Sequence, residues 1–288
     1  MRNSFNEISI PENKFLFESQ YHFKRSEKKY LINSSIAELL IGQIGFYLPK
    51  DEKTSKSPFI SSIYYDSCDW KCYKDQINKV SPRFKIRFRQ YTKDGTNSDK
   101  GFLEIKRKIN SLSVKDRLKV NIDFLESITD DHIPDEIKLL NKKLEIEKIN
   151  DIYFKIVSEI KKFNLHPVAR VSYSRQAFEN QEKTLRVTFN SNLKFYAIQN
   201  QLEKPITPSH KFSDNIIVMK IMYANKMPEW LFSLLKINKI SKQQFSKYCN
   251  AINYLYSGTK EDQQQNIGLV NKEDGLMNYG NAKKFIFN

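Results

Sequence analysis

The chain alternates short segments rich in Phe, Ile, Val and Tyr with a few segments of helical periodicity. Several of the short segments carry charge at every second position, which is typical of strands with one polar face. This order favours an antiparallel α+β fold over repeated βαβ units. The predicted strands cover residues 21–32, 60–66, 82–92, 101–109, 114–122, 167–179, 184–190, 193–198 and 214–223.

Four helices are predicted around these strands. Ser34 or Ser35 can cap the first helix, which runs to about residue 47. Pro134 opens a long helix to about Phe163, with an apolar residue at three- to five-residue steps that indicates a core-facing stripe. The last two helices are expected to begin at Pro228 and after a Ser241 cap.

The most informative strand reads RFKIRFRQY. Side chains alternate across a strand, so Arg83, Lys85, Arg87 and Arg89 share one face and the apolar residues share the other. Successive cations of this row lie about 6.6 Å apart, a step that one or two phosphoryl units of a linear chain can span. A solvated basic edge strand explains this stretch equally well when it is taken alone.

Two further strands share the same pattern. In FLEIKRK, Glu104, Lys106 and Lys108 alternate with apolar residues, and near the N-terminus Arg25, Glu27 and Lys29 share one face. Charged faces on neighbouring strands predict a closed barrel with a cationic interior, provided that helices cover the apolar faces. Guanidinium groups bind phosphate oxygens bidentately and lysines add compact charges, so this interior suits phosphate.

The overall charge agrees with an anionic partner. Forty-eight Lys and Arg against 33 Asp and Glu give a formal net charge of +15. No GxxxxGK[ST] or GxGxxG sequence occurs among only 8 glycines, which excludes a P-loop or a kinase glycine loop. Phosphates must therefore be held by side chains.

One domain, residues 21–256, is expected between an N-terminal extension (1–20) and a polar, flexible C-terminal tail (257–288). No apolar run has signal-peptide or membrane-span length, and three cysteines without paired spacing favour a reducing compartment. A cytoplasmic protein is predicted. The four histidines are scattered without metal spacing, so they receive no catalytic role.

Eight motifs follow one another along the chain: Glu27-x-Lys29-Tyr30, IYYDS (63–67), KIRFRQY (85–91), FLEIKRK (102–108), YSRQAF (173–178), LRVTFN (185–190), MPEWL (227–231) and FSKY (245–248). In this order they resemble the polyphosphate polymerase domain of the vacuolar transporter chaperone (VTC) family, in the triphosphate tunnel (CYTH-like) superfamily. The resemblance spans about residues 21–256 and is that of a bacterial, stand-alone member. It implies an antiparallel eight-stranded β-barrel, the triphosphate tunnel, flanked by helices.

The resemblance also implies a reaction in which the terminal phosphoryl group of ATP passes to a growing polyphosphate chain. Positions that match the family's catalytic phosphate-binding residues are Lys29, Arg87, Arg89, Lys106, Lys115, Arg175 and Lys247. Further substrate contacts are expected from Arg25, Lys85, Lys108, Tyr64 and Lys220. The family chemistry is similar to other phosphoryl transfers, in which positioning and charge neutralisation act with a divalent metal, here Mn or Mg.

Three positions depart from the family pattern. Lys220 stands where a metal-binding Glu is expected, Met222 where a Lys is expected, and Asn190 where an Asp is usual. An ammonium group repels a hard cation, which favours oxygen donors. Three explanations stay open: Glu104 or Glu27 rescues the metal site, substrate phosphates hold the metal, or turnover is impaired.

Three functions therefore compete. The first is an ATP-dependent polyphosphate polymerase with ATP and inorganic polyphosphate as partners. The second is a catalytically impaired accessory protein that binds polyphosphate or other polyanions. The third is nucleic-acid binding through the basic and aromatic segment 83–91, although no specific nucleic acid is expected. A triphosphate hydrolase ranks below the polymerase, because few inward glutamates are present. The primer, the oligomeric state and a membrane-protein partner stay open.

Overall fold

The computed structural model describes residues 26–96, 98–110, 112–126, 128, 132–198 and 210–256. Arg25, the proposed N-terminal extension and the proposed C-terminal tail lie outside these residues. No helix within the described ranges is long and apolar enough to cross a membrane.

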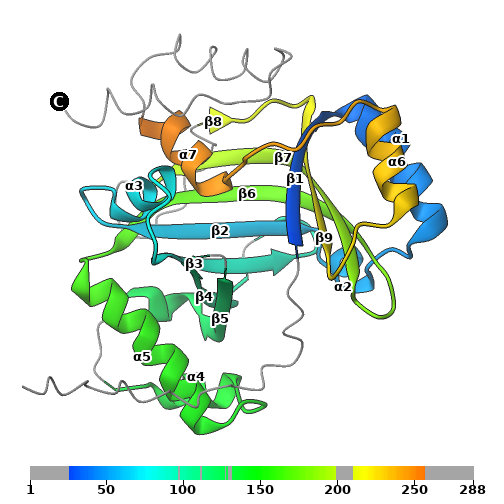
Figure 1. Cartoon of the computed structure of the whole chain (residues 1–288). Helices are drawn as coiled ribbons and strands as arrows, with labels where there is room; N and C mark the ends of the chain where they lie inside the picture. Colours follow the sequence, from blue (N-terminus) through cyan, green and yellow to red (C-terminus); the bar gives the residue numbers. More distant parts are fainter. Residues whose placement is uncertain are drawn as a thin grey trace, which may run out of the picture.

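One antiparallel sheet organises the described residues (Figure 1). Hydrogen bonds connect its strands in the order β1-β9-β7-β6-β2-β3-β4-β5, and the short strand β8 pairs with β7. The strands are β1 (Ser26–Asn33), β2 (Phe59–Asp66), β3 (Arg83–Thr92), β4 (Lys100–Ile109), β5 (Leu112–Asn121), β6 (His166–Glu179), β7 (Leu185–Ala197), β8 (His210–Lys211) and β9 (Ile216–Tyr223). The prediction of an α+β fold with a large antiparallel sheet is confirmed, and segments 184–190 and 193–198 form the single strand β7.

The sheet curls but is not closed by hydrogen bonds between its two ends. Its path ends at β1 on one side and β5 on the other, so the predicted closed barrel is wrong in this respect. Residues 241–246, which we call the strap, follow β1 instead: Gln243 N donates to the Lys29 carbonyl over 2.9 Å. Because the strap bonds to the free edge of β1, that edge is not available to β5 in the described structure.

Helices flank the sheet as expected. They are α1 (Ser34–Tyr47), α2 (Glu52–Lys56), α3 (Lys71–Ile77), α4 (Asp135–Leu140), α5 (Ile146–Lys162), α6 (Glu229–Ile237) and α7 (Lys247–Tyr256), with a 3-10 turn at Ile122–Glu126. In Figure 1, α1 and α6 lie side by side at one end of the molecule and α5 lies beside β4 and β5. One core cluster includes residues of α5, α7 and the central strands, and a second joins α1 and α6 to β1, β7 and β9.

Three helix predictions need correction. The predicted helix 134–163 is divided into α4 and α5, because the Asn141 side chain bonds the Lys119 backbone of β5, accepting over 2.9 Å and donating over 2.8 Å. Asn33, not a serine, caps α1 by accepting from Ile36 N over 2.8 Å. The last helix begins at Lys247, since the residues after Ser241 form the strap.

Candidate functional site

The basic row of β3 lies at the centre of the site. Arg87 pairs across the sheet with Tyr64 of β2 and with Glu104 of β4, so the three side chains share one face. Arg87 Nη1 donates to the Tyr64 hydroxyl over 3.2 Å. Arg89 is 5% exposed, and its Nε donates to Ser62 Oγ over 3.0 Å. These bonds from β2 fix the orientation of both guanidinium groups.

Glu104 of β4 forms ion pairs with a cation on each neighbouring strand, β3 and β5. Its carboxylate contacts Arg87 Nη2 at 2.7 Å and Lys115 Nζ at 2.5 Å, although the residue is only 1% exposed. Burial raises the pKa of this carboxyl, but Arg87, Arg89 and Lys115 outweigh burial and lower the pKa to about 2. Glu104 is therefore ionised and committed to two cations.

Arg175 approaches from β6 and is held by Asn190 of β7. Its Nε donates to Asn190 Oδ1 over 2.9 Å, and Asn190 Nδ2 donates to the Val218 carbonyl of β9 over 2.7 Å. A second guanidinium nitrogen, Nη2, donates to the Tyr173 hydroxyl over 3.1 Å. Asn190, the departure noted in the sequence, thus orients an arginine.

Glu27 of β1 is the second carboxylate of the site. Its two oxygens lie 3.4 Å from Lys29 Nζ and 3.6 Å from Lys220 Nζ of β9. Burial raises the pKa of Glu27, but Lys220, Lys29 and Lys106 outweigh it and lower the pKa to about 2. Burial lowers the pKa of Lys220 to about 8, although Glu27 opposes the shift.

The strap and the start of α7 contribute the remaining contacts. Lys29 Nζ donates to the Phe245 carbonyl over 2.8 Å, and Lys85 Nζ donates to Ser246 Oγ over 3.1 Å. Lys247 Nζ lies 4.6 Å from the centroid of the Tyr173 ring. Burial lowers the pKa of Lys247 to about 7, although Tyr173 opposes the shift. The strap therefore links β1 to β3, which are not neighbours in the sheet.

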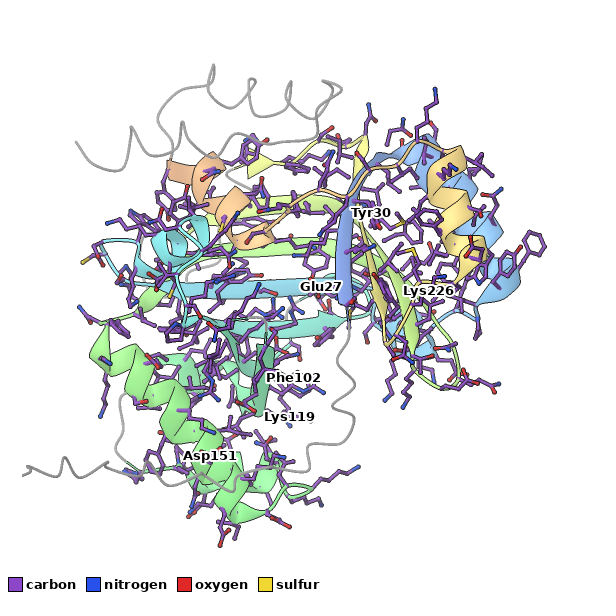
Figure 2. All side chains as sticks on the ribbon, in the orientation of Figure 1. Glu27, Tyr30, Phe102, Lys119, Asp151 and Lys226 are labelled. Carbon is purple, nitrogen blue, oxygen red and sulfur yellow. The ribbon has the colours of Figure 1, made fainter. Side chains whose placement is uncertain are left out.

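Charges from opposite ends of the sheet meet in this site. Five strands (β9, β7, β6, β2 and β3) separate β1 from β4 in the sheet order, yet Lys106 of β4 helps to lower the pKa of Glu27 on β1. Figure 2 shows Glu27 where β1 crosses the direction of the central strands. Such proximity requires a curled sheet. We call the convergent cations the basic cluster: Lys29, Lys85, Arg87, Arg89, Lys106, Lys115, Arg175, Lys220 and Lys247.

Most of the predicted site residues thus come together. Lys108 shares a face with Lys106 and both are exposed, but Lys108 lies nearer the end of β4, one position beyond Lys106 on that face. Tyr64 is buried and acts on the site through Arg87. Tyr173 and Ser62 are site residues that the sequence analysis does not predict, although Tyr173 precedes Arg175 by two residues and shares its strand face.

The two carboxylates predicted to bind Mn or Mg are already paired with basic side chains. Each candidate carboxylate, Glu27 and Glu104, already contacts two basic side chains. The described ranges contain no group of three or more His, Cys, Asp or Glu residues arranged to hold a metal ion. Hard divalent cations favour several oxygen donors, so these residues as arranged do not fit a protein-held Mn or Mg.

The family model and the similar curated proteins point to the same protein family. The family model described as the VTC domain matches residues 24–256, well over half of the chain. Vacuolar transporter chaperone complex subunit 4 of Trypanosoma cruzi (strain CL Brener) is 25% identical over 278 residues, which cover 82% of this chain and 35% of that protein. The Trypanosoma brucei brucei subunit 4 is 24% identical over 280 residues, with the same coverage. The chain thus spans about a third of the length of these relatives.

Solved structures give weaker similarity. A putative adenylate cyclase from Bacillus halodurans has a TM-score of 0.41 at 14% identity, covering 76% of this chain and 92% of that chain. The Mediator head module of Schizosaccharomyces pombe has a TM-score of 0.36 at 8% identity, covering 75% and 90%.

Proposed function

The chain belongs to the VTC domain family, and from this premise we propose that it is a polyphosphate polymerase-type domain. Its basic cluster binds the triphosphate of ATP and the end of a polyphosphate chain. An oxygen of the chain end attacks the terminal phosphorus of ATP. The bond from that phosphorus to the bridging oxygen breaks, the chain gains one phosphoryl unit, and ADP leaves.

The convergence of nine cations around two carboxylates is the observation that carries this proposal. Both carboxylates are already paired with cations of the cluster. The remaining positive charges repel one another in a partly buried site, which favours a polyanionic ligand. A linear phosphate chain supplies oxygens along its whole length, and it fits cations that come from β1, β3, β4, β5, β6, β9 and α7.

The residues have distinct tasks in the proposed reaction. Arg87, Arg89 and Arg175 present oriented guanidinium groups, which bind phosphate oxygens in pairs and neutralise the transferred phosphoryl group. Lys29 and Lys85, which bond to neighbouring residues of the strap, add point charges. Positioning and charge neutralisation carry most of the catalysis in phosphoryl transfer.

The experiment is incubation of the purified chain with ATP and either Mn or Mg, followed by electrophoresis of the phosphate products. Long chains are expected from the wild type, and Arg175→Ala is expected to lose most of the product. Arg107→Ala removes an arginine on the opposite face of β4 and is the matched control. Tight tripolyphosphate binding without product under either metal would reject the polymerase.

A second candidate function is polyphosphate binding without turnover. Lys220 favours it, because its ammonium group contacts Glu27 in the position where the family resemblance implies a metal-binding carboxylate. Under this alternative, Lys220→Glu combined with Met222→Lys switches on chain synthesis that the wild type lacks. Wild-type synthesis that the double substitution does not increase would remove the alternative.

A further inference from the structure

Tyr173 lies among four cations of the basic cluster, of which only Arg87 has a carboxylate partner within the described residues. The residue is 4% exposed and lies opposite Ile60 of β2 on regular strand β6, so its side chain shares a face with that of Arg175. The Tyr173 hydroxyl accepts from Arg175 Nη2 over 3.1 Å, and its ring lies 4.6 Å from Lys247 Nζ.

The charged groups that face Tyr173 come from each element packed around it. They are Arg175 on the same strand, Arg89 and Arg87 on β3, and Lys247 at the start of α7. Burial raises the pKa of the Tyr173 phenol, but these four cations outweigh burial and lower the pKa to about 6. A phenol with these neighbours is ionised at neutral pH.

We propose that Tyr173 is a third resident anion of the basic cluster beside Glu27 and Glu104, holding Arg175 and Lys247 in the ligand-free protein until a phosphate chain replaces it. The inference rests on the proposed function, since the ligand is the same phosphate chain. When the chain enters, the phenolate takes one proton from solvent. The neutral hydroxyl then donates a hydrogen bond to a phosphate oxygen, and Arg175 is released to bind the chain.

The phenolate should take up a proton because two anions in one site, the phenolate and the phosphate, repel each other. A phenolate and a phosphate oxygen bound to the same guanidinium repel each other strongly where water is largely excluded. Protonation removes this repulsion and converts an acceptor into a donor, which phosphate oxygens require. Tyr173 is thus a positioning residue that offsets part of the positive charge around Arg175 and Lys247 before substrate arrives.

The first test is a titration of ligand-free protein by near-ultraviolet tyrosinate absorbance, from about pH 5 to about pH 8. The wild type is expected to gain the absorbance of one tyrosinate with a midpoint of about 6. Tyr173→Phe is expected to lose this transition. Tyr64→Phe is the matched control, because it removes another buried hydroxyl that accepts from a cluster arginine. A wild type without the transition overturns the inference.

The second test adds tripolyphosphate at about pH 6.5, between the pKa values of Tyr173 and Lys247, while calorimetry follows binding. Loss of the tyrosinate absorbance in the wild type and in Tyr64→Phe, but no change in Tyr173→Phe, supports the inference. Binding with unchanged absorbance overturns it and leaves the proposed function standing. Absence of binding defeats the proposed function and the displacement step, whereas the ligand-free titration still decides whether Tyr173 is a resident anion.

Discussion

Glu27 and Glu104, the two carboxylates of the basic cluster, each contact two cations from different strands. Each carboxylate therefore links strands and lowers repulsion among the cations at the same time. A phosphate chain can take over the second task but not the first. At the scale of single residues, this distinction separates effects on stability from effects on binding.

Glu104→Gln tests the stabilising task. The substitution leaves Arg87 and Lys115 without their shared anion in a buried position, and the free energy of unfolding is expected to fall by about 2 kcal/mol in urea titrations. Tripolyphosphate should recover part of the loss, since it supplies negative charge to the same cations. Asp116→Asn breaks the more exposed pair with Arg107 and should cost about 0.5 kcal/mol. Equal losses would show that Glu104 has no special role.

Arg89→Lys tests the value of an oriented guanidinium. Lysine keeps the charge but loses the planar fork that binds two phosphate oxygens, so tripolyphosphate affinity measured by calorimetry should fall by about tenfold. Arg107→Lys on the opposite face of β4 is the control and should leave affinity unchanged. An Arg89→Lys protein that binds like the wild type would mean that charge alone matters at this position.

At the scale of elements, the approach of β3 to β4 depends on Gly101. A Cβ atom there would clash with the Phe88 ring and would lie 2.7 Å from the Arg89 carbonyl oxygen. Gly101→Ala should therefore lower the free energy of unfolding by about 2 kcal/mol. A Cβ atom at Gly42 in α1 would have no neighbour within 4 Å, so Gly42→Ala should raise stability by about 1 kcal/mol in the same urea titration. If both substitutions raised stability, or both lowered it, the close contact at Gly101 would not explain the effect.

The elements also show how far the sequence determines the fold. Alternation at residues 83–89 predicts β3 and its basic face, because that signal lies within one strand. The division between α4 and α5 depends on a bond from Asn141 to β5, and the strap depends on contacts between Gln243 and β1. Both are contacts between residues far apart in the sequence, which local periodicity cannot predict. The sequence does not predict the role of Tyr173 for the same reason, since its neighbouring charges come mainly from other elements.

At the scale of the whole molecule, pH should act on stability and on ligand binding in opposite directions. Burial lowers the pKa of Lys247 to about 7 and that of Lys220 to about 8, and the cations around Tyr173 lower its pKa to about 6. Each of these pKa values lies below the value for an unfolded chain. Between the folded and unfolded values the unfolded chain therefore binds more protons, and stability rises with pH.

Phosphate binding should respond the other way, because deprotonation of Lys247 and Lys220 removes positive charge from the basic cluster. From about pH 6 to about pH 9, we expect the urea midpoint of the ligand-free protein to increase while tripolyphosphate affinity decreases. Unfolding curves and calorimetry across this range, at constant ionic strength, measure the two trends. If the urea midpoint and the affinity changed in the same direction, the cations that destabilise the folded protein would not be those that bind the phosphate.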